Sequence, residues 1–186
     1  MKSIFGNELP LPDNQHPFRP MDTTMVLGRT LRFGGHANPE WTVLHHSMLV
    51  ALLWLRAYGP EGVEHALLHD LHEAITGDIP SPVKAAIGRK EIDRVQDELD
   101  LRVYKMVESP LPDTTDKALV KIVDYAALFI EGHYIGAPGH LQHIVDTGAG
   151  GKDPGVRKDI LDVIELMCPE VAKEMVRCGF LNIQGE

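Results

Sequence analysis

The stretch HDLHEAITGDIPSPVK, residues 69–84, combines an apolar helical pattern with a group of ionisable side chains. Apolar residues recur at the spacing of one helix face: Leu67, Leu68, Leu71 and Ile75. This spacing predicts a helix over residues 61–76 that ends at Gly77, and the prolines beyond it predict a loop. His69 and Asp70 then fall inside an apolar helix, where burial is costly unless both side chains find polar partners.

Helical patterns continue on both sides of this stretch. Apolar residues repeat with helical spacing over residues 41–58, 89–108 and 113–131, and again from residue 160 onward. The alternation of apolar and polar residues that is typical of half-buried strands does not occur, and the sequence has no internal repeat. The sequence therefore predicts an all-α fold, a compact helical bundle.

The length of 186 residues is ordinary for one globular domain, so we expect a single domain over residues 1–186. Residues 1–21 are rich in Pro, Asn and Asp and predict an irregular N-terminal arm. Residues 147–155 are rich in glycine and predict a flexible loop. Three histidines lie in or beside this polar connection and are expected to be solvated: His133, His140 and His143.

Composition and charge argue against two classes of binding partner, duplex nucleic acids and membranes. The formal net charge of −9 creates an acidic field that repels polyphosphate backbones, which argues against duplex nucleic acid as a partner. The apolar runs are too short to cross a bilayer, and the N-terminus lacks the apolar region of a signal peptide. We therefore expect no membrane partner and a cytoplasmic location. Cys168 and Cys178 form no metal-ligand pattern and are expected to be free thiols.

Four side chains of metal-ligand type interrupt otherwise apolar helical segments: His46, His69, Asp70 and Asp124. Imidazoles and carboxylates form a mixed set that suits one divalent ion such as Co²⁺, Zn²⁺ or Mn²⁺, with Mg²⁺ as an alternative. Single residues also have simpler interpretations. His46 can be an ordinary histidine at a helix start, and Asp124 can pair with Lys117 or Lys121 on its own helix. The four residues together favour a metal site, because a metal offsets the cost of burying them.

The order of these residues resembles the signature of the HD-domain phosphohydrolases, which is a histidine, then a His-Asp pair, then a distant aspartate. Residues 69–84 resemble the corresponding block of small bacterial 5′-deoxynucleotidases and of phage-type HD hydrolases. Residues 32–36 (RFGGH), with His46 and Ser47, resemble the phage-type branch, which includes dATP triphosphohydrolases. The resemblance runs from about residue 32 to residue 129 and implies that the helical bundle is an HD domain.

The resemblance implies that one divalent metal ion is held by four residues: His46, His69, Asp70 and Asp124. A water activated by this metal then attacks phosphorus. The resemblance also implies that Glu73 is the catalytic acid or base, and helical spacing would place Glu73 on the same face as His69. Relatives with two metals often have a lysine at this place, so Glu73 favours a single metal.

Contacts to the substrate are implied as well. Arg32 corresponds to a phosphate-binding arginine, and Asp78 to an aspartate that faces the sugar. Asp78 can equally be an ordinary turn residue after Gly77. Phe33 stands where the monophosphatases have a tryptophan that helps to exclude ribose, which leaves the preference for deoxyribose open. Lys84 is a further candidate cation, or else an ordinary surface lysine.

These features predict a metal-dependent phosphohydrolase of (deoxy)nucleotides, which releases phosphate from a 5′-monophosphate or triphosphate from a dNTP. A non-catalytic nucleotide sensor is the alternative from another class, and Glu73 argues against it because a sensor needs no catalytic carboxylate. The expected partner is a small-molecule nucleotide. A homo-oligomer is also open, because the apolar stripe over residues 89–108 can pack against a second subunit.

Overall fold

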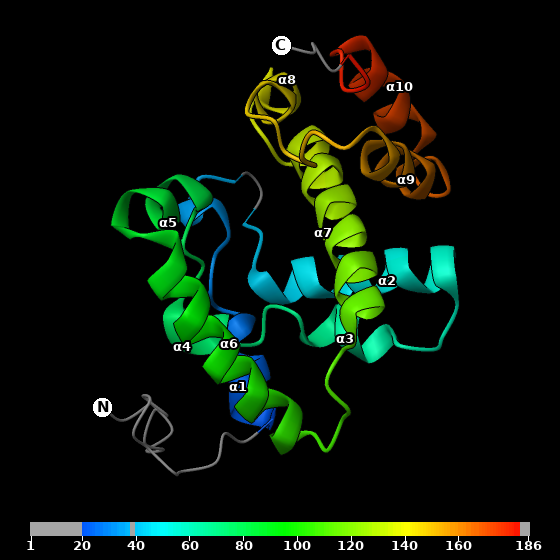
Figure 1. Cartoon of the computed structure of the whole chain (residues 1–186). Helices are drawn as coiled ribbons and strands as arrows, with labels where there is room; N and C mark the ends of the chain where they lie inside the picture. The colour runs from blue at the N-terminus through cyan, green and yellow to red at the C-terminus, as the bar shows by residue number, and fades with distance from the viewer. Residues whose placement is uncertain (1–19, 38–39, 183–186) are drawn as a thin grey trace. The chain divides into compact units, whose positions relative to one another are not determined.

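The computed structural model describes residues 20–37 and 40–182, and the regular structure in this part of the chain is helical (Figure 1). Among the described residues, β-type pairing is confined to an isolated bridge between Leu31 and Thr42. The elements in chain order are α1 (Pro20–Leu27), the 3-10 helix η1 (Phe33–Gly35), α2 (Val43–Tyr58), α3 (Val63–Leu68), α4 (Glu73–Thr76), α5 (Ser81–Ile87), α6 (Arg89–Met106), α7 (Thr114–Tyr134), α8 (His140–Asp146), α9 (Pro154–Glu165) and α10 (Pro169–Arg177). The all-α prediction is confirmed.

The described residues divide into two compact units. Unit 1 contains residues 20–36, 40–47 and 68–111. Unit 2 contains residues 37, 48–67 and 112–182. The division falls inside α2, after Ser47, and inside α3, after Leu67. A single HD domain over residues 1–186 stays a prediction.

Unit 2 is built on α7, whose first turn is fixed by a capping box. The Asp113 side chain accepts a hydrogen bond from the Asp116 N–H at 2.8 Å, and the Asp116 carboxylate accepts one from the Asp113 N–H at 3.0 Å. Helices α8, α9 and α10 pack against α7 (Figure 1). Fully buried side chains of this core include Val50, Leu53, Ala66, Val123, Ala126, Ala127, Phe129, Ile160, Ile164, Val171, Met175 and Phe180.

Helix α8 corrects the expectation for the segment after α7. Three apolar side chains of α8 are buried: Leu141, Ile144 and Val145. The apolar pattern of α8 is too short to stand out as periodic, so the sequence did not predict this helix.

The environment of His133 also differs from the expectation that this side chain is solvated: its Nδ1 lies 2.7 Å from Glu174 Oε2. The glycine-rich loop covers residues 147–153 rather than 147–155, because Asp153 caps α9, which begins at Pro154.

Unit 1 corrects the helix expected over residues 61–76. A turn over residues 69–72 separates α3 from α4. The turn is closed by two short-range hydrogen bonds, from the Leu71 N–H to Leu68 O and from the Glu73 N–H to Asp70 O, both 3.0 Å. Side chains of neighbouring residues in a helix diverge by about 100°. The turn instead allows His69 and Asp70 to approach each other.

A second correction concerns the residues after α4, where a loop is expected and α5 is found. Gly77, at φ +71°, ends α4, and α5 begins at Ser81 with Pro82 in its first turn. Proline is tolerated there because the first N–H groups of a helix have no partner within it. The prolines that prevent α4 from continuing therefore belong to the start of the next helix.

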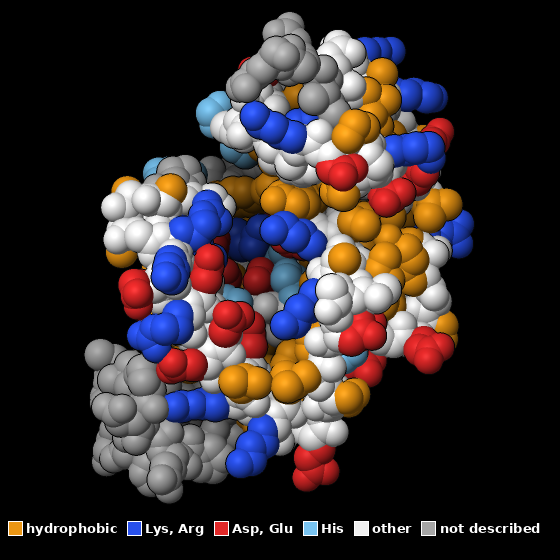
Figure 2. Space-filling model, in the orientation of Figure 1, with side chains coloured by type: hydrophobic (Ala, Val, Ile, Leu, Met, Phe, Trp, Pro, Cys, Tyr) orange, Lys and Arg blue, Asp and Glu red, His pale blue; other side chains and the backbone are white. Residues whose placement is uncertain are grey.

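Helix α6 is charged on its exposed face and packs in unit 1 through its apolar face. Figure 2 shows Lys and Arg side chains next to Asp and Glu side chains over α5 and α6. On the other face, Val103 and Tyr104 form a buried cluster with Leu68, against which Leu71 and Val107 pack. Part of the apolar stripe is thus buried within the unit, and a homo-oligomer stays a prediction.

Helix α1 begins at Pro20, so the last two residues of the expected N-terminal arm are helical. The rest of that arm lies outside the described residues. A search of the described helices found none with the length and apolar character needed to cross a membrane. Cys168 and Cys178 are free cysteines, as expected.

Candidate metal centre

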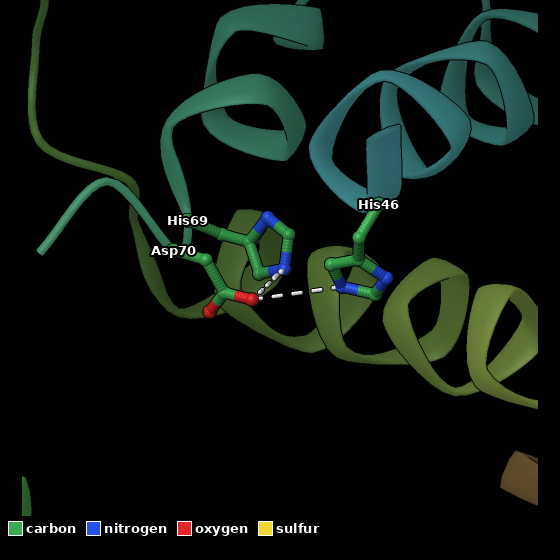
Figure 3. Close-up of side chains that lie close together, drawn as sticks. All are labelled: His46, His69 and Asp70. Carbon is green, nitrogen blue, oxygen red and sulfur yellow. Dashed lines mark ion pairs between the residues drawn. The ribbon is translucent and has the colours of Figure 1, made fainter. Parts of the chain in front are cut away.

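Three of the four expected metal ligands lie together in unit 1. Figure 3 shows the rings of His46 and His69 directed toward the Asp70 carboxylate. Asp70 Oδ2 lies 3.2 Å from His69 Nε2 and 3.5 Å from His46 Nε2. One ligand atom from each residue can be chosen so that all three lie within 4.8 Å of one another. His46 is completely buried, so the group faces little competition from bulk water on that side.

The position of His46 is fixed by the start of α2. The Thr42 hydroxyl accepts a hydrogen bond from the His45 N–H at 3.3 Å, as a threonine before a helix commonly does. The Val43 N–H donates to Thr30 O at 2.9 Å, next to the bridge between Leu31 and Thr42. The first turn of α2 is therefore tied to the preceding strand-like segment, and His46 projects from that turn.

The donor set of this group fits a divalent metal. Two imidazoles and one carboxylate are ligands that Zn²⁺, Co²⁺ and Mn²⁺ accept. Burial raises the pKa of Asp70, but the charge and hydrogen bond of His69, with smaller effects from His46 and His72, hold that pKa well below its usual value. Asp70 is consequently ionised, the state that metal binding requires.

Asp124, the fourth expected ligand, lies in α7 and therefore in unit 2. Its role as a ligand of the same ion stays a prediction. The alternative of an ion pair with Lys117 or Lys121 also stays open, since all three residues lie on α7. The candidate centre described here therefore consists of three residues of unit 1.

Glu73 begins α4 and is only 4% exposed. Burial, followed by the nearby charges of Asp70 and Asp78, raises the pKa of Glu73 from 4.5 to about 9, although Arg32 and Lys84 oppose the shift. Its Oε2 is buried and has no hydrogen-bond partner within the described part of the chain. The prediction that helical spacing places Glu73 on the face of His69 was wrong, because the chain between the two residues is not helical. The turn nevertheless brings Glu73 close to Asp70.

Because the folded chain holds a proton on Glu73 that the unfolded chain releases above pH 4.5, we expect the metal-free protein to lose stability as the pH rises toward about 9. The loss is at most about 1.4 kcal/mol per pH unit. Glu73→Gln carries no titrating carboxyl and should lack this loss. Urea unfolding of both metal-free proteins at several pH values measures the difference. Equal pH dependence of the two proteins would show that Glu73 does not hold this proton.

The structure places a further histidine, His72, beside the centre. It is 6% exposed, and its Nδ1 lies 2.8 Å from Asp100 Oδ1 on α6. Ligand atoms of Asp70, His72 and Glu73 lie within 4.8 Å of one another. When Nδ1 donates to Asp100, Nε2 keeps a lone pair, and a carboxylate that orients a histidine in this way is common next to metal sites. No sequence pattern indicates this pairing, because Asp100 lies 28 residues after His72.

Arg32, Phe33 and Asp78 also meet in unit 1. The Arg32 guanidinium, with its residue 9% exposed, lies 3.7 Å from Asp70 Oδ2 and 5.4 Å from the centre of the Phe33 ring. The Phe33 N–H donates a hydrogen bond to Asp78 Oδ2 at 3.1 Å. An arginine this close to the candidate metal centre can bind phosphate oxygens.

Lys84 lies on α5 and is half-buried. Its Nζ donates a hydrogen bond to Gln96 Oε1 at 3.4 Å, and its charge lowers the pKa of Glu73. Lys84 is therefore more than an isolated surface lysine, since it acts electrostatically on the group around Glu73. A contact between Lys84 and a substrate stays a prediction.

The chain is similar to a described protein family and to proteins of two bacteria. A family model for the HD domain matches residues 35–128, which include the three residues of the centre, Glu73 and Asp124. An uncharacterized protein of Rhodobacter capsulatus is 34% identical over 140 residues, which cover 72% of this chain and 69% of the relative. The uncharacterized protein YfdR of Escherichia coli is 28% identical over 115 residues, which cover 62% of this chain and 60% of that protein. The names of these relatives do not confirm the narrower resemblance to 5′-deoxynucleotidases or dATP triphosphohydrolases.

Proposed function

This chain belongs to the HD domain family, and from that membership we propose that it hydrolyses the 5′-phosphate ester of a (deoxy)nucleotide. The family itself supports a hydrolase with metal-dependent phosphohydrolase activity. The nucleotide substrate, the bond that is cleaved and the number of phosphates released belong to the proposal. The small bacterial 5′-deoxynucleotidases and the phage-type HD hydrolases that residues 69–84 resemble are the basis for choosing a nucleotide.

The observation that carries the proposal is the group of His46, His69 and Asp70, whose ligand atoms lie within 4.8 Å of one another. These residues would hold one divalent ion, and Asp124 is the proposed fourth ligand. When bound, such an ion polarises a phosphate oxygen and lowers the pKa of a water molecule, which makes that water a nucleophile near neutral pH. Co²⁺, Zn²⁺ and Mn²⁺ are the proposed metals, with Mg²⁺ as an alternative.

The surrounding residues have separate roles in this reaction. The water oxygen attacks phosphorus, the bond from phosphorus to the 5′-oxygen breaks, and the 5′-oxygen takes up a proton. Glu73 holds a proton close to Asp70 and is the proposed acid or base for these transfers. Arg32 is the proposed ligand of the phosphate oxygens, because its guanidinium lies 3.7 Å from Asp70. Lys84 contributes positive charge to the same group.

Two reactions satisfy this chemistry. Attack on a 5′-monophosphate gives a nucleoside and orthophosphate, whereas attack on a dNTP at the phosphorus next to the 5′-oxygen gives a nucleoside and intact triphosphate. Arg32 and Lys84 would offset phosphate charge in either reaction, so they do not distinguish the two. Phe33 stands in place of a tryptophan, so ribonucleotides belong in the test together with deoxyribonucleotides.

We expect the metal-loaded protein to hydrolyse at least one nucleotide when it is incubated with a panel of dNMPs, NMPs, dNTPs and NTPs. Separation of the products by anion-exchange chromatography identifies the reaction. Nucleoside with orthophosphate identifies a monophosphatase, and nucleoside with intact triphosphate identifies a triphosphohydrolase.

The protein treated with chelator serves as the control, and re-addition of Mn²⁺, Co²⁺, Zn²⁺ or Mg²⁺ identifies the metals that restore turnover. Binding of a nucleotide without turnover under every metal would contradict hydrolysis and favour the nucleotide sensor. Turnover of none of the nucleotides, without binding, would contradict the nucleotide substrate.

A further inference from the structure

The turn that carries Arg32 has an unusual backbone. Phe33, Gly34 and Gly35 all have positive φ values, of +56°, +60° and +79°. Glycine adopts this region readily, but a residue with a bulky side chain does so only when the surrounding structure holds it there. Residues 32–35 are named here the Arg32 turn. Its strained residue, Phe33, directly follows the arginine proposed to bind phosphate.

Hydrogen bonds hold the Arg32 turn from both sides. The Arg32 N–H donates to Trp41 O at 2.8 Å, and the Gly35 N–H closes the turn by donating to Arg32 O at 3.0 Å. The Phe33 N–H donates to Asp78 Oδ2 at 3.1 Å, across 45 residues of sequence. Of these contacts, the one from Asp78 acts directly on the backbone of the strained residue.

The position of Asp78 allows its carboxylate to hold the backbone of Phe33. Asp78 follows Gly77, whose φ of +71° ends α4 and turns the chain. Its charge contributes to the raised pKa of Glu73, so it lies near that residue. A carboxylate has two oxygens that accept hydrogen bonds, so the bond from Oδ2 to Phe33 leaves the carboxylate able to accept another.

We infer that Asp78 is a positioning residue that holds Phe33 in its left-handed conformation and thereby aims the Arg32 guanidinium at the phosphate site. The inference rests on the proposed function, because it takes Arg32 as the ligand of a phosphate. It differs from a contact between Asp78 and the sugar, which would leave the binding of a phosphate without sugar unchanged.

The two roles of Asp78 predict opposite changes in phosphate affinity when the residue is replaced. Asp78 is an anion near the proposed anion-binding site. Considered by itself, the loss of its negative charge should strengthen the binding of phosphate. Loss of the hydrogen bond to Phe33 should instead release the Arg32 turn and weaken binding. The two effects have opposite directions, and the measured direction tells which of them dominates.

The probe is inorganic phosphate, titrated by calorimetry into the metal-loaded protein. We expect Asp78→Ala to weaken phosphate binding about 10-fold or more, as loss of an orienting partner commonly does. Asp78→Asn keeps an oxygen that can accept from the Phe33 N–H and removes the negative charge, so it should bind phosphate at least as tightly as the original protein. Asp97→Ala removes an exposed carboxylate of α6 and should leave phosphate binding unchanged. Equal metal content is verified for every variant.

A double-mutant cycle with Arg32→Ala separates positioning from a general structural effect. If Asp78 acts through Arg32, Asp78→Ala should cause no further loss of phosphate binding in the Arg32→Ala background. Should Asp78→Ala fold poorly, Asp78→Glu takes its place, because it keeps the charge but shifts the carboxylate by one methylene relative to the Phe33 N–H. Phe33→Gly offers a second cycle. Glycine adopts the left-handed backbone without strain, so Asp78→Ala should weaken phosphate binding less in the Phe33→Gly background.

Unchanged or tighter phosphate binding by Asp78→Ala would overturn the inference, as would an equal loss in both Arg32 backgrounds. The nucleotide panel tests the proposed function independently. A protein that hydrolyses no nucleotide but shows the expected cycle with phosphate keeps the positioning role and loses the proposed substrate. A protein that hydrolyses nucleotides but shows no coupling between Asp78 and Arg32 keeps the function and loses the positioning role.

Discussion

Asp70→Ala should lose bound metal and activity together. Asp70 Oδ2 lies near the Nε2 atoms of both His46 and His69, so its removal leaves two imidazoles and takes the negative charge from the group. His69→Ala should have the same effect, because it removes one of three ligands. Even residues that only orient metal ligands change affinity about 10- to 100-fold, and the loss of a ligand itself should reach at least ~100-fold.

Elemental analysis and turnover, measured on the same preparation, test this expectation. Asp93→Ala is a matched control, because it removes an exposed carboxylate of α6 from the same unit. Circular dichroism verifies that the variants keep their helical content. Full metal occupancy in either Asp70→Ala or His69→Ala would contradict the assignment of the metal centre.

Asp124→Ala extends this prediction to the fourth ligand. If Asp124 binds the same ion, its removal should reduce metal affinity together with activity, as for Asp70→Ala. If Asp124 instead pairs with Lys117 or Lys121 on α7, metal content should stay full. A titration of metal-free protein with Co²⁺, followed by its absorption spectrum, distinguishes the two outcomes, since the spectrum responds to the number and kind of ligands.

The long helices were predictable because each one has an apolar pattern that repeats over many turns. Helix α7 is an example, with its start marked by Asp113 and its apolar residues buried along the helix. Short elements lack that repetition. Helix α5 was hidden because its prolines suggested a loop, and α8 because its apolar residues are so few.

The part of the candidate site that was predictable is the part that individual residue types mark in the sequence. His46, His69 and Asp70 stand out as ionisable residues among apolar ones, and the structure brings them together. The break between α3 and α4 was not predictable, because an apolar helical pattern runs through it without interruption. The pairs His72 with Asp100 and Phe33 with Asp78 were not predictable either, since no sequence pattern links residues 28 or 45 positions apart.

Glu73→Ala should keep the metal and still bind nucleotide while turnover falls by ~100-fold or more, which is the usual contribution of a positioned acid or base. The helical spacing that first suggested this role does not apply, because a turn intervenes. The geometry supports it on other grounds. Glu73 groups with Asp70 and His72 rather than with His46 and His69, and burial raises the pKa of Glu73 in the metal-free protein, so its side chain holds a proton that it can donate.

The decisive comparison is turnover against metal content in one preparation of Glu73→Ala. If Glu73 were a ligand, metal content would fall together with the rate, as for Asp70→Ala. Glu73→Gln keeps the size and polarity of the side chain but cannot transfer a proton, so it should be as slow as Glu73→Ala if proton transfer is the role. Glu165→Ala, at the exposed end of α9, is the matched control. Unchanged turnover in Glu73→Ala would contradict both roles, because neither a ligand nor a proton donor can be removed without slowing the reaction.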